Sequence, residues 1–477
     1  MLDKRKFYIN GEWIDPIAPH DLEVINPATE QPIALISMGT AADIDRAVAA
    51  AKTAFASYSR TSLDERIALL EKLLEIYTRR YDEMARTITL ELGAPITMST
   101  DQQAHVGVGH LEGFIEALKR VKLREELPNG DIVLREPIGV CGLITPWNWP
   151  INQIALKVIP ALATGSTCVL KPSEFTPLNA LLYAEMVHEA GFPAGTFNLV
   201  NGDGINVGAA LSKHRDVDMM SFTGSTRAGT AVSKDAADTV KRVTLELGGK
   251  SPNIVFEDAD LEERIAGSVL ECFNNSGQSC DAPTRLLVQR SVYDQAVEIA
   301  QRVGSEVKVG NPEEAGEHIG PLVSDIQYGR VQTLIEAGIA EGADLIVGGP
   351  GKPEGFETGY FVKPTIFAGV NNQMRIAREE VFGPVLAIIP FDTEEEAIEI
   401  ANDTNYGLAA YIQSGDLDRA ERVAARLRAG MVHINGAPHR YGSPFGGYKQ
   451  SGNGREGGMF GLEDFLEIKT VHRPSAA

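Results

Sequence analysis

The alternation of short apolar runs with helical stretches between residues 138 and 247 constrains the fold most. Short apolar runs are typical of strands buried on both faces, and they occupy residues 138–144, 167–170, 197–200, 219–222 and 242–245. Helical patterns separate them, near 153–163, 177–190, 205–212 and 226–237. This alternation predicts an α/β fold with a doubly wound, Rossmann-like parallel sheet, the usual binding site of a dinucleotide.

A second alternating series begins near Ser251 and continues to about residue 445. Its expected elements are strands at 251–256 and 285–288 and helices near 260–273 and 293–303. We therefore expect a second α/β unit. The Gly-rich stretch 441–448 is predicted to be a loop that crosses between the two lobes. The alternating tail 465–471 is a candidate for a strand added to another subunit's sheet.

Two helix boundaries stand out near the N-terminus. Ser62 and Glu65 form a capping-box pattern that predicts the start of an amphipathic helix reaching Tyr77. A following helical pattern ends at Gly93, with Pro95 just beyond it.

The charge and cysteine content limit the possible partners. The chain carries 44 basic and 65 acidic side chains, a formal net charge of −21, which disfavours nucleic acid and acidic membrane faces as partners. The sequence shows no secretory signal and no apolar run of about 18 residues. Four cysteines without a Cys-x-x-Cys pair, and nine histidines without close metal-binding spacing, favour a reducing compartment and no metal. We expect a cytoplasmic protein.

Cys280 differs from the other three cysteines because it lies in a polar segment, 274–283, where a thiol would be reachable. Cys141, Cys168 and Cys272 lie in apolar surroundings typical of a core. An isolated cysteine is more often structural than catalytic, so the case for a nucleophile rests on context.

Glu246 and Asn148 are the other candidates for chemistry. Glu246 follows an expected buried strand, where a carboxylate is either paired or a general base with a raised pKa. Asn148 lies between Pro146 and Pro150, in a turn that is either merely rigid or a means of preorganising an oxyanion donor.

Two glycine-rich loops compete for the cofactor phosphates. The loop 202–208, which includes Gly204, departs from the dinucleotide fingerprint in its last spacing. The loop 222–226 follows a strand and opens a helix, and is preferred. Lys171 and Glu174 follow another strand of the same sheet, as ribose contacts do, although two charged residues in an exposed turn would look the same.

Seven blocks together resemble the aldehyde dehydrogenase superfamily over nearly the whole chain. They are Pro146–Pro150, Lys171–Glu174, Phe222–Thr226, Leu245–Lys250, Asn275–Cys280, Glu379–Pro384 and Ser443–Lys449. The resemblance implies that Cys280 is the nucleophile and Glu246 the general base. It assigns the oxyanion hole to the Asn148 amide and the backbone N–H of Cys280.

The resemblance also implies the binding residues. The expected NAD(P) contacts are Ile144, Thr145, Pro146, Trp147, Lys171, Glu174, Gly204, Phe222, Gly224, Ser225, Leu247, Glu380 and Phe382. The expected substrate pocket comprises Trp149, Ser279, Asp281 and Phe445, and the expected proton relay comprises Lys157 and Glu456. Because Glu174 would repel a 2′-phosphate, NAD is favoured, while Lys171 keeps NADP open.

The expected domains follow from the same resemblance. They are an NAD(P)-binding domain (1–119 and 139–248), a catalytic domain (249–445) and a small β oligomerisation element (120–138 and 456–477). The chain is expected to form a homo-oligomer, a tetramer rather than a dimer.

The implied reaction is oxidation of an aldehyde to the acid through a Cys280 thioester that water hydrolyses. The alternatives are an acyl-transferring dehydrogenase, an esterase using the same cysteine, and a non-catalytic protein on this fold. Relatives that transfer the acyl group to coenzyme A generally lack the glutamate found here at Glu246. Asp281, directly after the nucleophile, either favours a polar or cationic substrate tail or turns away to cap a helix.

Overall fold

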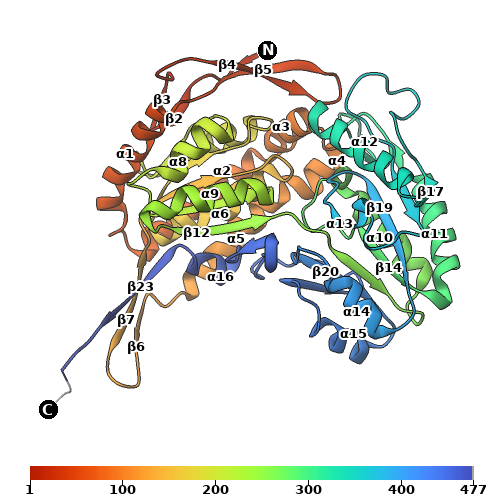
Figure 1. The fold of residues 1–477 in the computed structure, drawn as a ribbon. Coiled ribbons are helices and arrows are strands. Elements are labelled where there is room, and N and C mark those ends of the chain that lie inside the picture. Colours follow the sequence, from red (N-terminus) through yellow and green to blue (C-terminus); the bar gives the residue numbers. More distant parts are fainter. Residues whose placement is uncertain (475–477) are drawn as a thin grey trace.

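The computed structural model describes residues 1–474 and contains two large sheets, each flanked by helices (Figure 1). The first has the order β22-β12-β11-β8-β9-β10-β2-β3. Its strands are β2 Phe7–Ile9, β3 Glu12–Ile14, β8 Val140–Ile144, β9 Thr167–Lys171, β10 Phe197–Leu199, β11 Met219–Gly224, β12 Arg242–Leu247 and β22 Gly452–Asn453. The strands β8 to β12 are parallel, and β2, β3 and β22 are antiparallel edges. The predicted parallel sheet is confirmed.

The strand order creates a crevice at the carboxyl ends of β8 and β11. From β8 the chain proceeds through β9 and β10 on one side, then returns to β11 and β12 on the other. The connections leaving β8 and β11 therefore diverge, and open α/β sheets bind ligands at such a switch point. Ile144 and Gly224 end the two strands and border this crevice.

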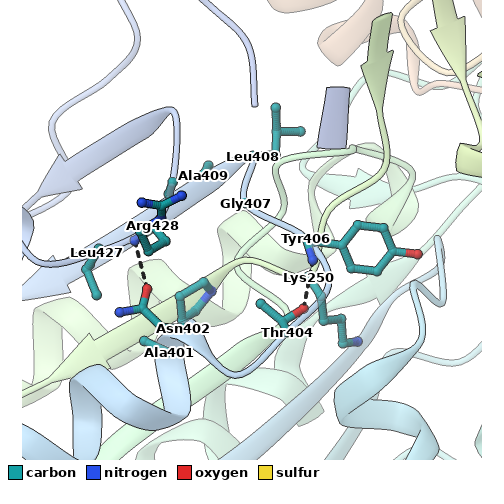
Figure 2. Close-up of a pocket in the computed structure, with 13 residues that line it drawn as sticks. Lys250, Ala401, Asn402, Thr404, Tyr406, Gly407, Leu408, Ala409, Leu427 and Arg428 are labelled. Atoms are coloured by element: carbon teal, nitrogen blue, oxygen red, sulfur yellow. Dashed lines mark hydrogen bonds between the residues drawn. The ribbon is translucent and has the colours of Figure 1, made fainter. Parts of the chain in front are cut away.

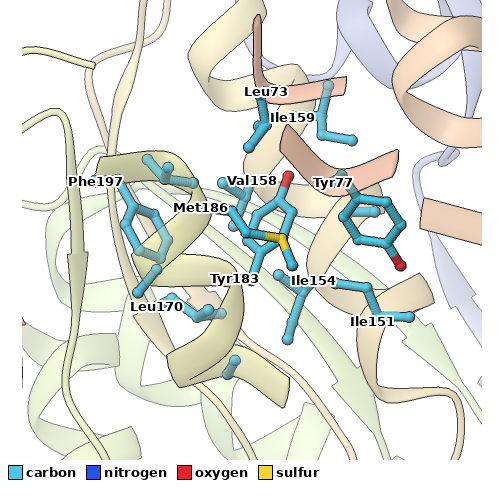
Figure 3. Packing of buried hydrophobic residues seen from close by; sticks show 14 of the residues in the cluster. Leu73, Tyr77, Ile151, Ile154, Val158, Ile159, Leu170, Tyr183, Met186 and Phe197 are labelled. Carbon is cyan, nitrogen blue, oxygen red and sulfur yellow. The ribbon is translucent and has the colours of Figure 1, made fainter. Parts of the chain in front are cut away.

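Helices cover both faces of the first sheet because alternate strand residues point in opposite directions. On one face Leu143 and Leu170 pack into a core with five helices, and on the other Ile144 and Val169 pack against three. The first set is α2 Leu63–Arg79, α3 Tyr81–Leu92, α5 His105–Arg120, α6 Pro150–Thr164 and α7 Leu178–Glu189, and the second is α1 Ala41–Tyr58, α8 Ala209–Lys213 and α9 Thr226–Ala236. Figure 3 shows the first core, where Tyr183 lies among aliphatic side chains.

The predicted helix boundaries near the N-terminus are confirmed. Ser62 Oγ accepts the Glu65 N–H at 3.2 Å, and the Glu65 carboxylate accepts the Ser62 N–H at 2.7 Å. The next helix, α3, ends at Gly93, whose φ of 83° is left-handed and suits glycine.

The second sheet has the order β17-β18-β19-β14-β13-β20-β21, and only β17 runs antiparallel to its neighbour. Its strands are β13 Pro252–Val255, β14 Arg285–Gln289, β17 Asp344–Val347, β18 Thr365–Ala368, β19 Val385–Phe391, β20 Ala409–Gln413 and β21 Met431–Ile434. Its principal helices are α10 Leu261–Phe273, α11 Tyr293–Glu306, α12 Asp325–Ala340, α14 Glu394–Asn402 and α15 Leu417–Ala424. This matches the second α/β unit expected from the sequence.

A three-stranded arm, β6 Arg124–Glu126, β7 Ile132–Pro137 and β23 Leu466–Val471, projects from the body (Figure 1). The tail is a strand, as expected, and it pairs antiparallel with β7 of its own chain. It remains an edge of the sheet β23-β7-β6. Residues 475–477 of the expected oligomerisation element lie outside the described residues.

The remaining elements are small. A three-stranded sheet near the N-terminus comprises β1 Leu2–Asp3, β4 Asp21–Asn26 and β5 Gln31–Ser37. Short elements elsewhere are α4 Ile96–Met98, β15 Lys308–Val309, β16 His318–Ile319, α13 Arg375–Arg378 and α16 Gly458–Glu463. Among residues 1–474, none of the helices combines the length and apolar character needed to cross a membrane.

Two buried tyrosines of the first core provide a stability test. The Tyr77 hydroxyl donates to Ala104 O at 2.8 Å, whereas the Tyr183 hydroxyl has no partner among the described residues. An unpartnered buried hydroxyl costs on the order of 1–3 kcal/mol. We expect Tyr183→Phe to raise the free energy of unfolding by about 1 kcal/mol and Tyr77→Phe to lower it by about 1 kcal/mol. The thermal midpoints of both variants check this prediction. An equal decrease of the midpoint in both variants would contradict it.

Candidate active site

A cavity of about 150 Å³ lies where the crevice of the first sheet meets the second lobe. Its lining comprises Pro146, Trp147, Asn148, Thr223, Gly224, Ser225, Glu246, Leu247, Gly248, Cys280, Gln327, Arg330, Glu380 and Phe382. The structure therefore brings all three predicted catalytic residues into one cavity with most of the predicted cofactor contacts.

The loop that carries Cys280 connects α10 to β14 and has an unusual backbone. Asn275 and Ser276 have φ values of 51° and 56°, a left-handed conformation that non-glycine residues rarely adopt. The Asn275 amide donates to Asn148 O at 2.8 Å, and Ser276 Oγ donates to Gly320 O at 2.8 Å. These bonds hold the strained loop in place, as expected where geometry matters for function.

The Asn148 side chain is buried beside the same loop. It lies in the turn between β8 and α6, and Pro150 opens the helix at a position where proline fits. Its Nδ2 donates one hydrogen bond to Gln278 O at 3.0 Å. Because an amide nitrogen carries two hydrogens, one more donor remains for a ligand, as an oxyanion site requires.

Glu246 lies on β12 with only 4% of its surface exposed. Neither carboxylate oxygen has a hydrogen-bond partner among residues 1–474. Burial, and then the charge of Glu456, raise the pKa of Glu246, while Lys157 opposes them. Lys157 and Glu456 form a buried ion pair, so the two predicted relay residues contact each other and act electrostatically on Glu246.

Glu380 and Phe382 enter the cavity from the turn before β19. Glu380 Oε1 accepts the Gly249 N–H at 3.1 Å, and burial raises the Glu380 pKa to about 7. Phe382 has a φ of 58°, and its ring meets Trp147 edge-on at 5.2 Å. Gln327 holds this turn by donating to Phe382 O at 2.8 Å.

The Cys280 thiol is half-buried and surrounded by acidic groups. Burial raises the pKa of the thiol, and the charges of Asp281, Glu380 and Glu246 raise it further. The three remaining cysteines are fully buried. Cys280 is thus the accessible cysteine of the chain, but its resting form is the protonated thiol.

The other predicted cofactor contacts lie along the crevice outside this cavity. Thr145 follows β8 and its N–H donates to Lys171 O at 3.2 Å, and Lys171 Nζ pairs with Glu174 at 3.2 Å. Gly204 begins a short π-helical segment after β10. The Phe222 side chain is 6% exposed and packs in the hydrophobic core, so only its backbone is available to a cofactor.

The four predicted substrate-pocket residues line a second cavity, of about 420 Å³, which Cys280 also borders. Trp149 Nε1 donates to Ser279 Oγ at 2.8 Å, which fixes both side chains. The predicted members are Trp149, Ser279, Asp281 and Phe445, and unpredicted ones include His110, Gln153, Glu271, His439 and Tyr441. The thiol therefore lies at the junction of the two cavities.

Local sequence patterns carried no signal for Gln327 and Arg330. Both lie on α12, and Arg330 Nη2 donates to Glu380 O at 2.9 Å. They join the cavity only because the fold packs α12 against the turn before β19. Likewise, His110 on α5 reaches the second cavity, with Nε2 hydrogen-bonded to Asn152 Oδ1 at 2.7 Å.

A third cavity, drawn in Figure 2, is unrelated to this chemistry. It measures about 10 Å³, room for a single water. Lys250 and the loop around Tyr406 line it, and burial lowers the Lys250 pKa to about 8. None of the predicted catalytic or cofactor residues lines this cavity.

Comparison with known proteins agrees with this geometry. The model of the aldehyde dehydrogenase family matches residues 13–471. A 3-succinoylsemialdehyde-pyridine dehydrogenase from Pseudomonas sp is 55% identical over 472 residues, 99% of each chain.

Two crystal structures superpose over nearly the whole chain. An aldehyde dehydrogenase from Bartonella henselae is 54% identical, with a TM-score of 0.98 over 99% of both chains. A mutant of aldehyde dehydrogenase C from Pseudomonas syringae, complexed with NAD+ and octanal, is 49% identical, with a TM-score of 0.97 over 98% of this chain and 96% of that one. The chain belongs to the aldehyde dehydrogenase family.

Proposed function

We propose that this protein oxidises an aldehyde to the carboxylic acid with NAD, through a thioester on Cys280. One observation carries the proposal: the Cys280 thiol borders both cavities, one lined by the predicted cofactor contacts and one by the predicted substrate pocket. A thiol in this position can react with a carbonyl on one side while a hydride acceptor lies on the other.

The first step is addition of the Cys280 thiolate to the aldehyde carbon. The raised pKa of the thiol means that a base must take its proton, and Glu246 lies in the same cavity with both oxygens free of partners among the described residues. The carbonyl oxygen becomes an oxyanion, which the free N–H of Asn148 stabilises. Such a donor typically contributes on the order of 100- to 1000-fold in rate.

The residues of the crevice fit NAD. Ser225 caps α9 by accepting the Ala228 N–H, and the N-terminus of α9 is suited to face a pyrophosphate. Glu174, whose carboxylate pairs with Lys171 and with no other residue among 1–474, is suited to ribose hydroxyls and repels a 2′-phosphate. When bound, the nicotinamide accepts the hydride that leaves the reacting carbon, and the carbon becomes a thioester.

Hydrolysis completes the reaction. Glu246 takes a proton from water, the hydroxide adds to the thioester carbon, and the Cys280 thiolate leaves. The charges of the buried Lys157–Glu456 pair act on Glu246. We assign to this pair the transfer of the proton away from Glu246. An acyl-transferring enzyme has no need of this base, which favours hydrolysis.

The substrate proposal is an aldehyde with an apolar or aromatic portion. Trp149 and Phe445 border the second cavity, whose volume of about 420 Å³ accommodates a medium-sized molecule. The named relatives include a pyridine semialdehyde dehydrogenase and an enzyme complexed with octanal, so a general aldehyde dehydrogenase and a narrower semialdehyde enzyme both fit.

The domain division follows the two sheets. We assign cofactor binding to 1–119 and 139–248 and catalysis to 249–445. We assign oligomerisation to 120–138 and 456–477, which contribute the three strands of the projecting arm, and the open edge strand β23 suits assembly of a homotetramer.

Cys280→Ala is expected to abolish NADH formation on a panel of aliphatic, aromatic and semialdehyde substrates. Glu246→Gln lacks the base for both steps, so both the first release of NADH and the later steady rate are expected to fall on the order of 100-fold. Stopped-flow absorbance at NADH wavelengths separates the two phases, with unchanged thermal midpoints showing that the variants are folded. Steady turnover by Cys280→Ala would refute the mechanism.

The alkylation of Cys280 by iodoacetamide is expected to rise beyond pH 9, because the thiol pKa lies above the ordinary value of about 8.5. Removing a nearby negative charge stabilises the thiolate and lowers that pKa. Asp281→Asn should therefore react about three- to tenfold faster at pH 8. Peptide mass spectrometry follows the reaction, and Glu262→Gln, on α10 but outside both cavities, is the control. A midpoint below pH 8 in the native protein would contradict this prediction.

Glu174→Gln is expected to raise kcat/KM for NADP about tenfold relative to NAD, because it removes the charge that repels the 2′-phosphate. The matched control is Glu189→Gln, the last residue of α7, at the end of the helix away from Glu174. If the NADP preference of Glu174→Gln stays within twofold of the native value, Glu174 does not contact the ribose.

A further inference from the structure

A chamber of about 450 Å³ adjoins the substrate cavity, and both are bordered by Glu271, Asp281, Pro438 and His439. The chamber lies between α10, the end of β20 and the segment after β21. Its lining comprises Asn253, Glu263, Arg264, Gly267, Ser268, Glu271, Asp281, Pro283, Tyr411, Gln413, His433, Gly436, Ala437, Pro438 and His439.

The two carboxylates at the junction have no positively charged partner. Neither Glu271 nor Asp281 forms an ion pair or a side-chain hydrogen bond with another described residue. Glu271 is exposed, but partial loss of solvent, and then the charge of Asp281, raise its pKa to about 6. Glu271 is therefore still mostly ionised at neutral pH, and the junction carries unneutralised negative charge.

Two further acceptors in the chamber lack donors. Gln413 is 4% exposed, and its Nε2 donates to Asn253 Oδ1 at 3.0 Å, which leaves Oε1 without a partner among the described residues. His433 Nδ1 lies 2.8 Å from Ala437 O and donates to it, so Nε2 is an acceptor, also unpartnered. Buried acceptors without donors are uncommon in native proteins.

Three of the donors around the chamber are engaged within the protein. Arg264 donates to Asn435 O at 2.8 Å and pairs with Glu263 at 3.1 Å. Asn253 Nδ2 donates to Ser268 Oγ at 2.7 Å, and the Tyr411 hydroxyl donates to Asp281 O at 3.1 Å. The chamber groups without a partner among the described residues thus include two carboxylates and the buried Gln413 Oε1, which favour a positively charged ligand with N–H donors.

We propose that this chamber binds the far end of the substrate, a positively charged nitrogen group that bears N–H donors, such as an ammonium, a guanidinium or a protonated nitrogen heterocycle. Glu271 and Asp281 neutralise the charge, and Gln413 Oε1 and His433 Nε2 accept the N–H groups. The Tyr411 and His433 rings, stacked at 4.8 Å, offer a flat surface to a planar group. The inference rests on the proposed function, because the aldehyde end must reach Cys280.

The test compares kcat/KM with NAD for three aldehydes of similar length: 4-guanidinobutanal, 4-(trimethylammonio)butanal and hexanal. The native protein is expected to prefer the guanidinium aldehyde to hexanal. The trimethylammonium aldehyde should rank between them, because it has the charge without N–H donors. Glu271→Gln and Asp281→Asn should each lower the ratio of guanidinium aldehyde to hexanal about three- to tenfold.

Propylguanidinium provides a second measurement that does not require turnover of a cationic aldehyde. It is expected to compete with hexanal, with an inhibition constant about three- to tenfold weaker in each variant. Glu262→Gln removes a charge from the same helix outside the chamber and should leave both readouts unchanged.

The outcomes separate this inference from the proposed function. Absence of NADH formation from every aldehyde would refute the proposed function. If hexanal is oxidised, but Glu271→Gln and Asp281→Asn both keep the ratio and the inhibition constant within twofold of native values, the chamber does not bind a cation. Equal losses for hexanal and the guanidinium aldehyde would likewise overturn the inference, since they would indicate a structural role.

Discussion

The site depends on two consecutive glycines that leave no space for a side chain. Gly248 and Gly249 follow β12, the strand that carries Glu246. A Cβ on Gly248 would lie 2.3 Å from Glu380 Oε2, and one on Gly249 would lie 2.4 Å from Cys280 O. A side chain at Gly249 would collide with backbone, and one at Gly248 would force the Glu380 carboxylate to turn away. Glycine at both positions lets the backbone leaving the first sheet pass between the cofactor-side carboxylate and the nucleophile loop.

The same kind of close approach recurs on the other side of Cys280. Gly277, with a φ of 72°, packs closely against the turn before β19. A Cβ on Gly277 would lie 2.1 Å from Gly383 O. This contact joins the strained loop at Asn275 to the turn that carries Glu380 and Phe382. The three catalytic candidates are therefore positioned by backbone packing as much as by side-chain hydrogen bonds, which is why a thiol, a base and an amide from distant parts of the chain meet in one cavity.

Helices and strands are predicted well from the sequence where local periodicity or a capping pattern defines them. The parallel strands β8 to β12 and the boundaries of α2 and α3 depend on patterns within a few residues, and the structure confirms them, whereas the antiparallel strands β2, β3 and β22 were not predicted. Pairing between strands that are distant in the sequence is harder to predict. The pairing of β23 with β7 could not be read from the tail, because an alternating strand does not specify its neighbour.

The site shows the same division between local and distant information. Cys280, Glu246 and Asn148 stand within distinctive segments, whereas Arg330 and Glu271 lie on ordinary amphipathic helices. The helical pattern predicts that each residue lies on the polar face of its helix. It does not predict that this face borders a cavity, because that depends on how α12 and α10 pack in the fold. Phe222 illustrates the reverse, since a residue within a distinctive segment turns its ring into the core.

The acidity around Cys280 has a physical consequence for how the thiol is used. Asp281, Glu380 and Glu246 all disfavour the thiolate, so the nucleophile rests in its less reactive form. The nearby carboxylates also disfavour anionic substrates but stabilise positive charge in either cavity. A positively charged group that binds beside Cys280 would offset these carboxylates and lower the thiol pKa. Electrostatics then couple occupancy of the cavities to activation of the nucleophile, without any movement of the rigid loop that holds it.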